Sequence, residues 1–242
     1  MKSGGRLIYM GAGTSGRLGV LDASECPPTF GVDSGLVVGI IAGGDRALRY
    51  AVENAEDRAE FGATDLQNLN VSAKDTVVGI SASGYAPYCV GGLDYAKSAD
   101  ALTIAMSCNR NAILSGHADI AIEMPTGSEI LSGSTRLNAG TATKLALNML
   151  STLTMVQMGK VYGNLMVDMR PTNTKLQDRA IRIVQNALHI SRDEAQTWYL
   201  AAEKNVKVAI VMYKTGAEIS AARQALQDSD GFIRRAVAKL RG

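Results

Sequence analysis

The sequence predicts an α/β fold, with a doubly wound parallel sheet followed by a small C-terminal helical bundle. Short apolar, β-prone runs alternate with helical patterns, the first such run ends in a glycine-rich turn, and strand-like runs stop after about residue 170. Alternation of strands and helices is typical of βαβ units around a parallel sheet. We therefore expect a sheet domain over residues 1–173 and a helical domain over 174–242.

Five runs are predicted strands because they are continuously apolar, as strands buried on both faces of a parallel sheet are. They cover residues 6–10, 36–41, 75–80, 101–106 and 120–122. Helices are expected at 45–60 and 87–98, followed by a long helix at 137–161. In the long helix, Leu145, Met149, Leu153 and Val156 form an apolar stripe that should pack against the sheet.

The C-terminal region contains only amphipathic helical patterns, which cover residues 174–188, 192–202, 205–213, 217–225 and 230–240. Ser191 and Glu194 have the spacing of a capping box, which predicts the start of a helix. Gly216 and Gly231 punctuate the later helices.

Composition excludes several functional classes. Lys plus Arg total 25 against 23 acidic residues in 242, and no basic run stands out, so nucleic acid is not an expected partner. No apolar run approaches the ~20 residues of a membrane span, and the N-terminus lacks the apolar core of a signal peptide. Three cysteines without paired spacing favour a reducing compartment, so we expect a cytoplasmic protein.

The two histidines, His117 and His189, leave little material for a histidine metal site or a Ser-His-Asp triad. We therefore expect no metal or other cofactor. Catalysis must then rest on carboxylates, hydroxyls or backbone amides.

The turn after the first predicted strand, Gly11-Ala-Gly-Thr-Ser-Gly16, fits the G-x-G-x-x-G pattern of dinucleotide folds. A dinucleotide site would place an acidic residue at the end of the second strand, but glycines occupy that position and Asp45 is better interpreted as a helix N-cap. The hydroxyls of Thr14 and Ser15, added to the amides of a helix N-terminus that includes Gly13, suit a phosphate monoester better.

Two further polar segments follow later strands. Ser81, Ser83 and Gly84 come between the strand at 75–80 and a helix, and the carboxyl ends of neighbouring parallel strands share one crevice. We therefore expect the two hydroxyl loops to converge on one ligand-binding crevice. A third run offers Ser132, Ser134 and Thr135 near the long helix, with Glu129 to hold sugar hydroxyls. That these residues merely cap the helix is an equally open interpretation.

Two carboxylates are candidates for acid–base chemistry. Glu25 lies in the segment 22–29, which is predicted to be a loop stiffened by two prolines. Glu56 lies in the predicted helix at 45–60, nearest a buried stripe of Leu48, Val52, Ala55 and Ala59. Of the acids on that helix, Glu56 is the one expected to be partly desolvated.

The segment 11–19, followed by Asp22-Ala-Ser-Glu-Cys-Pro-Pro-Thr29, resembles the signature of N-acetylmuramic acid 6-phosphate etherases. The resemblance continues through residues 81–84, 134–141 and 161–171, so it covers essentially the whole chain. It implies the sugar-isomerase (SIS) fold, which the glucokinase regulatory protein shares without the etherase role, and a small ubiquitin-associated-like bundle at the C-terminus.

The resemblance also implies an activity, which is cleavage of the lactyl ether of N-acetylmuramic acid 6-phosphate during cell-wall recycling. The products would be N-acetylglucosamine 6-phosphate and D-lactate, formed by elimination and hydration without a metal. By motif match Glu25 takes the acid role and Glu56 is the probable base. The family's sites are typically completed across a homodimer. Its members carry a helical segment before the first strand, which here begins at Arg6, so we expect pairing and activity to be sensitive to that difference.

Three other functions stay open from the residues. A noncatalytic sugar-phosphate regulatory protein of the same fold would need the hydroxyl loops without two poised carboxylates. An aldose–ketose isomerase would also use a base at C2 but would release no lactate. A dinucleotide enzyme would bind nucleotide at the Gly11 turn.

Overall fold

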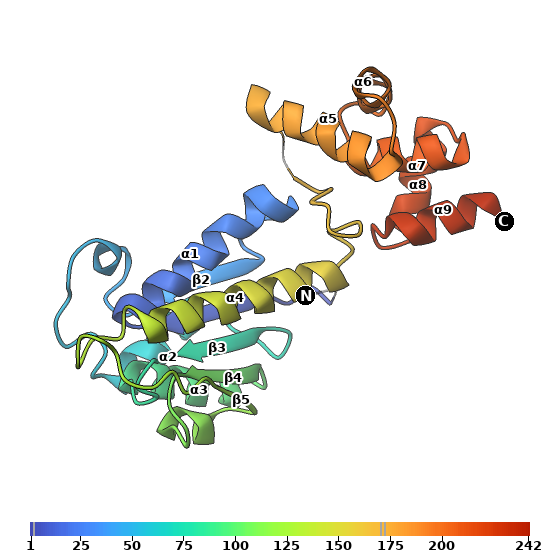
Figure 1. Cartoon of the computed structure of the whole chain (residues 1–242). Helices are drawn as coiled ribbons and strands as arrows, with labels where there is room; N and C mark the ends of the chain where they lie inside the picture. Colours follow the sequence, from blue (N-terminus) through green and yellow to red (C-terminus); the bar gives the residue numbers. More distant parts are fainter. Residues whose placement is uncertain (2, 170, 172) are drawn as a thin grey trace. The chain divides into compact units, whose positions relative to one another are not determined.

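The computed structural model describes residue 1 and residues 3–169, 171 and 173–242, which form two compact units (Figure 1). The first unit comprises Met1–Cys26 and Asp33–Ser151, and the second comprises Pro27–Val32 and Thr152–Gly242. The expected domain limits at 173 and 174 stay a prediction. Arg170 and Thr172, beside that limit, lie outside the described residues.

The first unit contains a five-stranded, entirely parallel sheet with the strand order β2-β1-β3-β4-β5. Its strands are β1 (Leu7–Gly11), β2 (Val37–Ile41), β3 (Thr76–Ile80), β4 (Leu102–Ser107) and β5 (Ile120–Glu123). All five predicted strands are confirmed. Because β1 lies between β2 and β3, the carboxyl ends of these three strands meet at one edge of the sheet, which is where the polar loops begin.

Helices cover both faces of this sheet (Figure 1). They are α1 (Gly13–Phe30), the 3₁₀ helix η1 (Asp45–Leu48), α2 (Ala59–Asn68), α3 (Pro87–Ser98), the 3₁₀ helix η2 (Ile113–His117) and α4 (Asn138–Gln157). Alternate residues of β1 point to opposite faces. Ile8 and Met10 join the core that contains Leu66 of α2 and Leu93 of α3, whereas Tyr9 lies against Gly19 of α1.

Two local predictions are wrong. Residues 22–29 are not a loop, because α1 continues through Pro27 and Pro28 to Phe30. Ala23, Cys26 and Phe30 are buried, and burial of this face outweighs the hydrogen bonds that the two prolines cannot donate near the helix end.

The segment 45–60 is likewise not one helix. It begins with the short η1, continues as irregular chain and becomes helical again only at Ala59. Gly44 precedes η1 with a φ of 67°, so Asp45 is its first residue and not its cap, and Asn54 adopts a φ of 59°. Left-handed residues of this kind interrupt an α-helix.

The apolar stripe predicted to pack against the sheet points away from it. Leu145, Met149, Leu153 and Val156 are 48%, 61%, 63% and 38% exposed. The buried face of α4 instead contains Ala139, Thr143, Leu147, Ser151 and Met155.

The buried carboxylate of Asp22 on α1 gives the reason for this orientation. Its Oδ1 accepts hydrogen bonds from Asn148 Nδ2 (2.6 Å) and from Ser151 Oγ (3.0 Å) of α4. A carboxylate taken out of water needs such donors. The side of α4 that carries Asn148 and Ser151 therefore turns toward α1, and the apolar stripe faces outward.

The second unit contains five further helices among the described residues, all close to their predicted bounds. They are α5 (Thr174–Leu188), α6 (Arg192–Ala201), α7 (Val206–Thr215), α8 (Ile219–Asp228) and α9 (Ile233–Arg241). Ser191 caps α6 as predicted, since its side chain accepts from Glu194 N at 3.2 Å. Within the described residues, no helix has both the length and the apolar character that a membrane crossing would require.

Asp75 joins the start of β3 to the start of β1. Its carboxylate, 3% exposed, accepts from Arg6 Nη2 (2.8 Å), Arg6 Nε (3.1 Å), Arg6 N (2.8 Å) and Ser72 N (3.0 Å). Burial raises the pKa of Asp75, but the bonds from Arg6 and Ser72 outweigh burial and lower the pKa to about 2. A carboxylate with a lowered pKa in the folded state adds stability above its unfolded pKa of about 4, and that stability is lost as the pH falls toward 2.

We predict that Asp75→Asn lowers the free energy of unfolding by about 2 kcal/mol at neutral pH, and by about half as much near pH 3. Urea unfolding at the two pH values measures the effect. Asp100→Asn, on the exposed turn after α3, is the control and should change stability by less than about 0.5 kcal/mol. Equal losses for Asp75→Asn at both pH values would contradict this assignment.

Candidate active site

The turn from β1 into α1 exposes the first amides of a helix. Gly16 N donates to Ala12 O at 3.2 Å, so the N–H groups of Gly13, Thr14 and Ser15 precede the helical hydrogen-bond ladder. This turn is tightly packed at Gly16, where a Cβ would lie 2.5 Å from Gly11 O and 2.6 Å from Ile41 Cγ1. The turn therefore has three N–H groups outside the helical ladder, next to the hydroxyls of Thr14 and Ser15.

The loop after β3 lies beside this turn, because Gly11 is paired with Ile80 in the sheet. Ser81 Oγ and Ser83 Oγ are 3.2 Å apart and share a hydrogen bond. Gly84 donates its N–H to Ser81 O (2.9 Å) at a φ of 76°, a conformation that favours glycine, and so closes the loop.

The two loops and one residue of the third polar run line a single pocket of about 150 Å³, here called the hydroxyl pocket. Its lining consists of Ala12, Gly13, Thr14, Ser15, Glu56, Ile80, Ser81, Ala82, Ser83, Ala86 and Thr135. None of these residues is cationic. An anion here would be held by hydroxyls and by the amides of helix N-termini, which attract negative charge.

Glu56 reaches this pocket from irregular chain and not from a helix. Ala55 is buried in the core, and Glu56 O accepts from Tyr88 N of α3 at 3.0 Å. These two contacts fix the backbone of the segment against the first turn of α3. The side chain of Glu56 is exposed in the single chain, so the prediction that its carboxylate is partly desolvated is wrong.

Glu25 does not lie with Glu56. It is exposed on α1, twelve residues after Gly13, which corresponds to about 18 Å along the helix axis. It lines neither the hydroxyl pocket nor the pocket next to it. Within one chain, the structure therefore does not bring the two candidate carboxylates together.

Glu129 is a helix cap. Its Oε2 accepts from Asn138 N (2.9 Å) and its Oε1 from Ala139 N (3.0 Å), both in the first turn of α4. These hydrogen bonds from Asn138 and Ala139 lower the pKa of Glu129. Since both oxygens are engaged, the capping interpretation describes Glu129 better than a role in holding sugar hydroxyls.

Of the three hydroxyl residues near Glu129, only Thr135 lines the hydroxyl pocket. Ser134 Oγ accepts from Arg136 N at 3.4 Å, and Ser132 is exposed; neither lines the hydroxyl pocket. A Cβ on Gly140 would lie 3.7 Å from Thr14 Cγ2, which places the start of α4 beside the start of α1.

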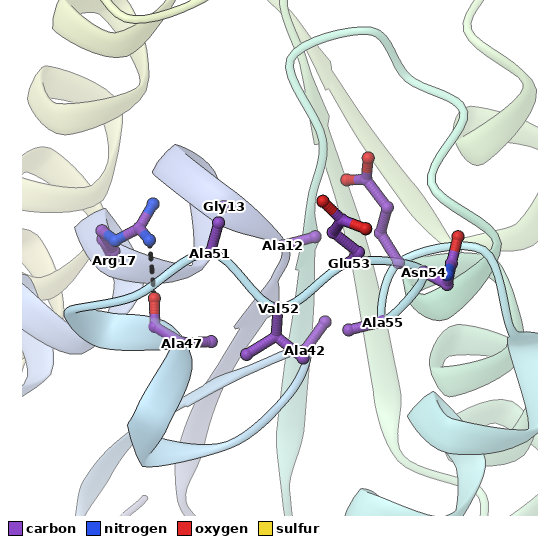
Figure 2. Close-up of a pocket in the computed structure, with 11 residues that line it drawn as sticks. Ala12, Gly13, Arg17, Ala42, Ala47, Ala51, Val52, Glu53, Asn54 and Ala55 are labelled. Atoms are coloured by element: carbon purple, nitrogen blue, oxygen red, sulfur yellow. Dashed lines mark hydrogen bonds between the residues drawn. The ribbon is translucent and has the colours of Figure 1, made fainter.

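Arg17 was missed by the sequence analysis. It lines a second pocket of about 200 Å³, which shares Ala12, Gly13 and Glu56 with the hydroxyl pocket and is here called the Arg17 pocket (Figure 2). The sequence does contain one signal that could have identified Arg17. It follows Gly13 by four residues in a predicted helix, and residues four apart lie on the same face of a helix.

We predict that Gly16→Ala lowers the free energy of unfolding by about 2 kcal/mol, because a Cβ would collide with a backbone oxygen that cannot move away freely. Urea unfolding measures this loss. Gly35→Ala is the control, since a Cβ there meets open space, and it should stay within about 0.5 kcal/mol. A Gly16→Ala chain as stable as the control would contradict the close approach.

Comparison with known proteins places these features in a family. The family model of the glucokinase regulatory protein N-terminal SIS domain matches residues 1–97. A solved phosphoheptose isomerase from Francisella tularensis has a TM-score of 0.47 and 19% identity, covering 64% of this chain and 78% of that chain, a likeness too distant to bear on function.

Close relatives match almost the whole chain. An N-acetylmuramic acid 6-phosphate etherase from Exiguobacterium sp. is 55% identical over 236 residues, which is 98% of this chain and 80% of that protein. One from Actinobacillus succinogenes is 54% identical over 238 residues, or 98% of this chain and 78% of that protein. The chain therefore has the α/β sugar-isomerase fold and belongs to the N-acetylmuramic acid 6-phosphate etherase family.

Proposed function

We propose that the chain cleaves the lactyl ether of N-acetylmuramic acid 6-phosphate, giving N-acetylglucosamine 6-phosphate and D-lactate in the recycling of peptidoglycan amino sugars. The observation that carries this proposal is the hydroxyl pocket with Glu56 at its edge, in a chain 55% identical to an etherase of that name. Its identity to etherases favours this carbon–oxygen lyase over a noncatalytic regulatory protein of the same fold.

The hydroxyl pocket would bind the 6-phosphate. Thr14, Ser15, Ser81 and Ser83 supply hydroxyls, and the first turn of α1 supplies N–H groups at the positive end of its dipole. Ser15 and Ser81 are 8% and 5% exposed, so water competes little for their hydroxyls. An anion in the pocket could therefore accept hydrogen bonds from them. Thr135 closes the pocket from the start of α4.

Glu56 would act as the base. In the open-chain sugar, the aldehyde at C1 acidifies the proton on C2, and a carboxylate at the edge of the phosphate site can remove it. The electron pair of that C–H bond forms the C2–C3 double bond as the C3–O bond breaks. Lactate then leaves with the ether oxygen.

Glu25 would act as the acid and then as the base of the second step. It donates a proton to the departing lactate oxygen and afterwards takes a proton from the water that adds to C3. Glu56, protonated in the first step, is exposed and exchanges its proton with water before it donates a proton to C2. The sum is hydrolysis of the ether, with both carboxyl groups restored.

Because Glu25 is remote from Glu56 in one chain, we propose that a second copy supplies it in a homodimer. Leu21, 45% exposed, precedes Glu25 by one turn on α1, so the two share one exposed face. A partner that covers Leu21 would also contact Glu25. Glu25 of one copy could then complete the pocket at Glu56 of the other.

The outward stripe of α4 supports the same proposal. Leu145, Met149, Leu153 and Val156 follow one another along one face of the helix, and α4 lies beside α1 through the bonds to Asp22. A continuous apolar surface of this kind marks an interaction site in a folded protein. A symmetric dimer buries the same patch from both copies.

A cytoplasmic location is part of this proposal. Cys26, Cys89 and Cys108 are free and buried, and burial raises the pKa of each thiol. Such thiols fit a reducing compartment, where sugar phosphates are metabolised.

We predict that Glu25→Gln and Glu56→Gln each slow D-lactate release by at least about 100-fold, since general acid–base groups contribute that much or more. Lactate is measured by coupled oxidation, and calorimetry should show that both variants still bind N-acetylglucosamine 6-phosphate. Asp57→Asn, on the same segment as Glu56 but outside both pockets, is the control and should stay active. An active Glu56→Gln chain would remove the proposed base.

We also predict that the two inactive variants complement each other. When Glu25→Gln and Glu56→Gln chains are mixed and re-associated, about a quarter of wild-type activity should return, because half the dimers are mixed and each has one intact site. Adding Met149→Glu to both chains should abolish both the dimer and the recovery, by sedimentation and by assay. No recovery between chains that do form dimers would show that Glu25 acts within its own subunit.

A further inference from the structure

The Arg17 pocket has one fixed cation. Arg17 is half-buried on α1, and its Nε and Nη2 donate to Leu48 O (3.0 Å) and Ala47 O (2.6 Å), the last residues of η1. Figure 2 shows the bond to Ala47. These two carbonyls hold the guanidinium plane in place. Among the described residues, none engages Nη1, so part of the guanidinium stays available to a ligand.

Apart from Glu53, Asn54 and Glu56, the other residues that line the pocket are small and apolar. Its walls include Ala42, Ala51, Val52 and Ala55, which come from the chain after β2 (Figure 2). An apolar wall facing a fixed guanidinium suits a ligand that carries a carboxylate and a short alkyl group.

The Arg17 pocket adjoins the hydroxyl pocket, since Ala12, Gly13 and Glu56 line both. Glu56 therefore lies where the two meet. In the proposed substrate, C4 and C5 separate the phosphate-bearing C6 from C3, the lactyl group branches from C3, and C2 is the next carbon beyond C3. A phosphate in the hydroxyl pocket and the C2 proton at Glu56 would direct the lactyl group toward Arg17.

The charges of the lining residues also favour a carboxylate next to Arg17. The proposed substrate has two anionic groups, and among the described residues Arg17 is the single cation that lines either pocket. Glu53 also lines the Arg17 pocket, but its side chain is exposed, so water screens its repulsion of an incoming carboxylate.

We propose that the Arg17 pocket is the subsite for the lactyl group, with the Arg17 guanidinium binding the lactyl carboxylate and the alanine and valine side chains contacting its methyl group. This inference rests on the proposed function. It makes Arg17 a determinant of specificity, because N-acetylglucosamine 6-phosphate lacks the lactyl group and cannot use the subsite. Once lactate departs, the sugar product loses this contact and is released more readily.

The test compares two sugars that differ only in the lactyl group. Calorimetry in a Glu56→Gln background, which prevents turnover, gives the Kd for N-acetylmuramic acid 6-phosphate and for N-acetylglucosamine 6-phosphate. Arg17→Met should raise the first Kd by about 10- to 100-fold, since hydrogen bonds between charged groups are worth that much, and the second by less than about 3-fold. Arg17→Lys, which keeps the charge but not the fork, should lie between.

Two further variants keep the result interpretable. Arg49→Met removes an exposed cation next to η1 that does not line the pocket, and it should change neither Kd. Ala51→Leu fills the pocket without touching the bonds of Arg17, and it should weaken the lactyl sugar alone.

Equal weakening of both sugars by Arg17→Met would show that Arg17 only holds η1, and would overturn the proposal. No effect on either sugar would overturn it as well. Failure of the proposed function would give a different result. The Glu56→Gln chain with Arg17 intact would then bind neither sugar, and the wild type would release no lactate.

Discussion

Parallel pairing of β1 with β3 is the constraint on which the site depends. The register sets Gly11 beside Ile80, so the turn into α1 and the loop into α3 leave the sheet next to each other. Each loop alone offers two hydroxyls, and together they form the hydroxyl pocket. The Tyr88 N–H lies in the first turn of α3 and has no acceptor within the helix. It donates to Glu56 O, which holds the Glu56 carboxylate at the edge of that pocket.

A second constraint is the buried carboxylate of Asp22. It needs hydrogen-bond donors, and Asn148 and Ser151 supply them from α4, which turns that side of the helix toward α1. The apolar stripe on the opposite face is left without a partner in the described residues of this chain. One internal polar interaction thus leaves exposed the surface on which we expect a second copy to bind.

Most of the sheet could be predicted, because continuous apolar runs bounded by glycine turns are a strong strand signal. The convergence of Thr14, Ser15, Ser81 and Ser83 followed from the same topology, whereas the surroundings of both carboxylates did not. Glu25 seemed to lie in a loop because prolines follow it, yet burial of Cys26 and Phe30 keeps α1 helical. Glu56 seemed to lie in a helix, but Asn54 at a φ of 59° and the contacts of Ala55 place it in irregular chain. Such contacts come from elsewhere in the fold, so local periodicity could not reveal them.

The central claim is that Glu56 starts an elimination by taking the C2 proton. The most direct measurement is mass spectrometry of both products formed in water labelled with deuterium and ¹⁸O. Elimination and hydration predict deuterium at C2 of N-acetylglucosamine 6-phosphate and D-lactate without ¹⁸O, because the ether oxygen leaves with lactate. A sugar that keeps its original hydrogen at C2, or lactate that gains ¹⁸O at its hydroxyl, would contradict the account.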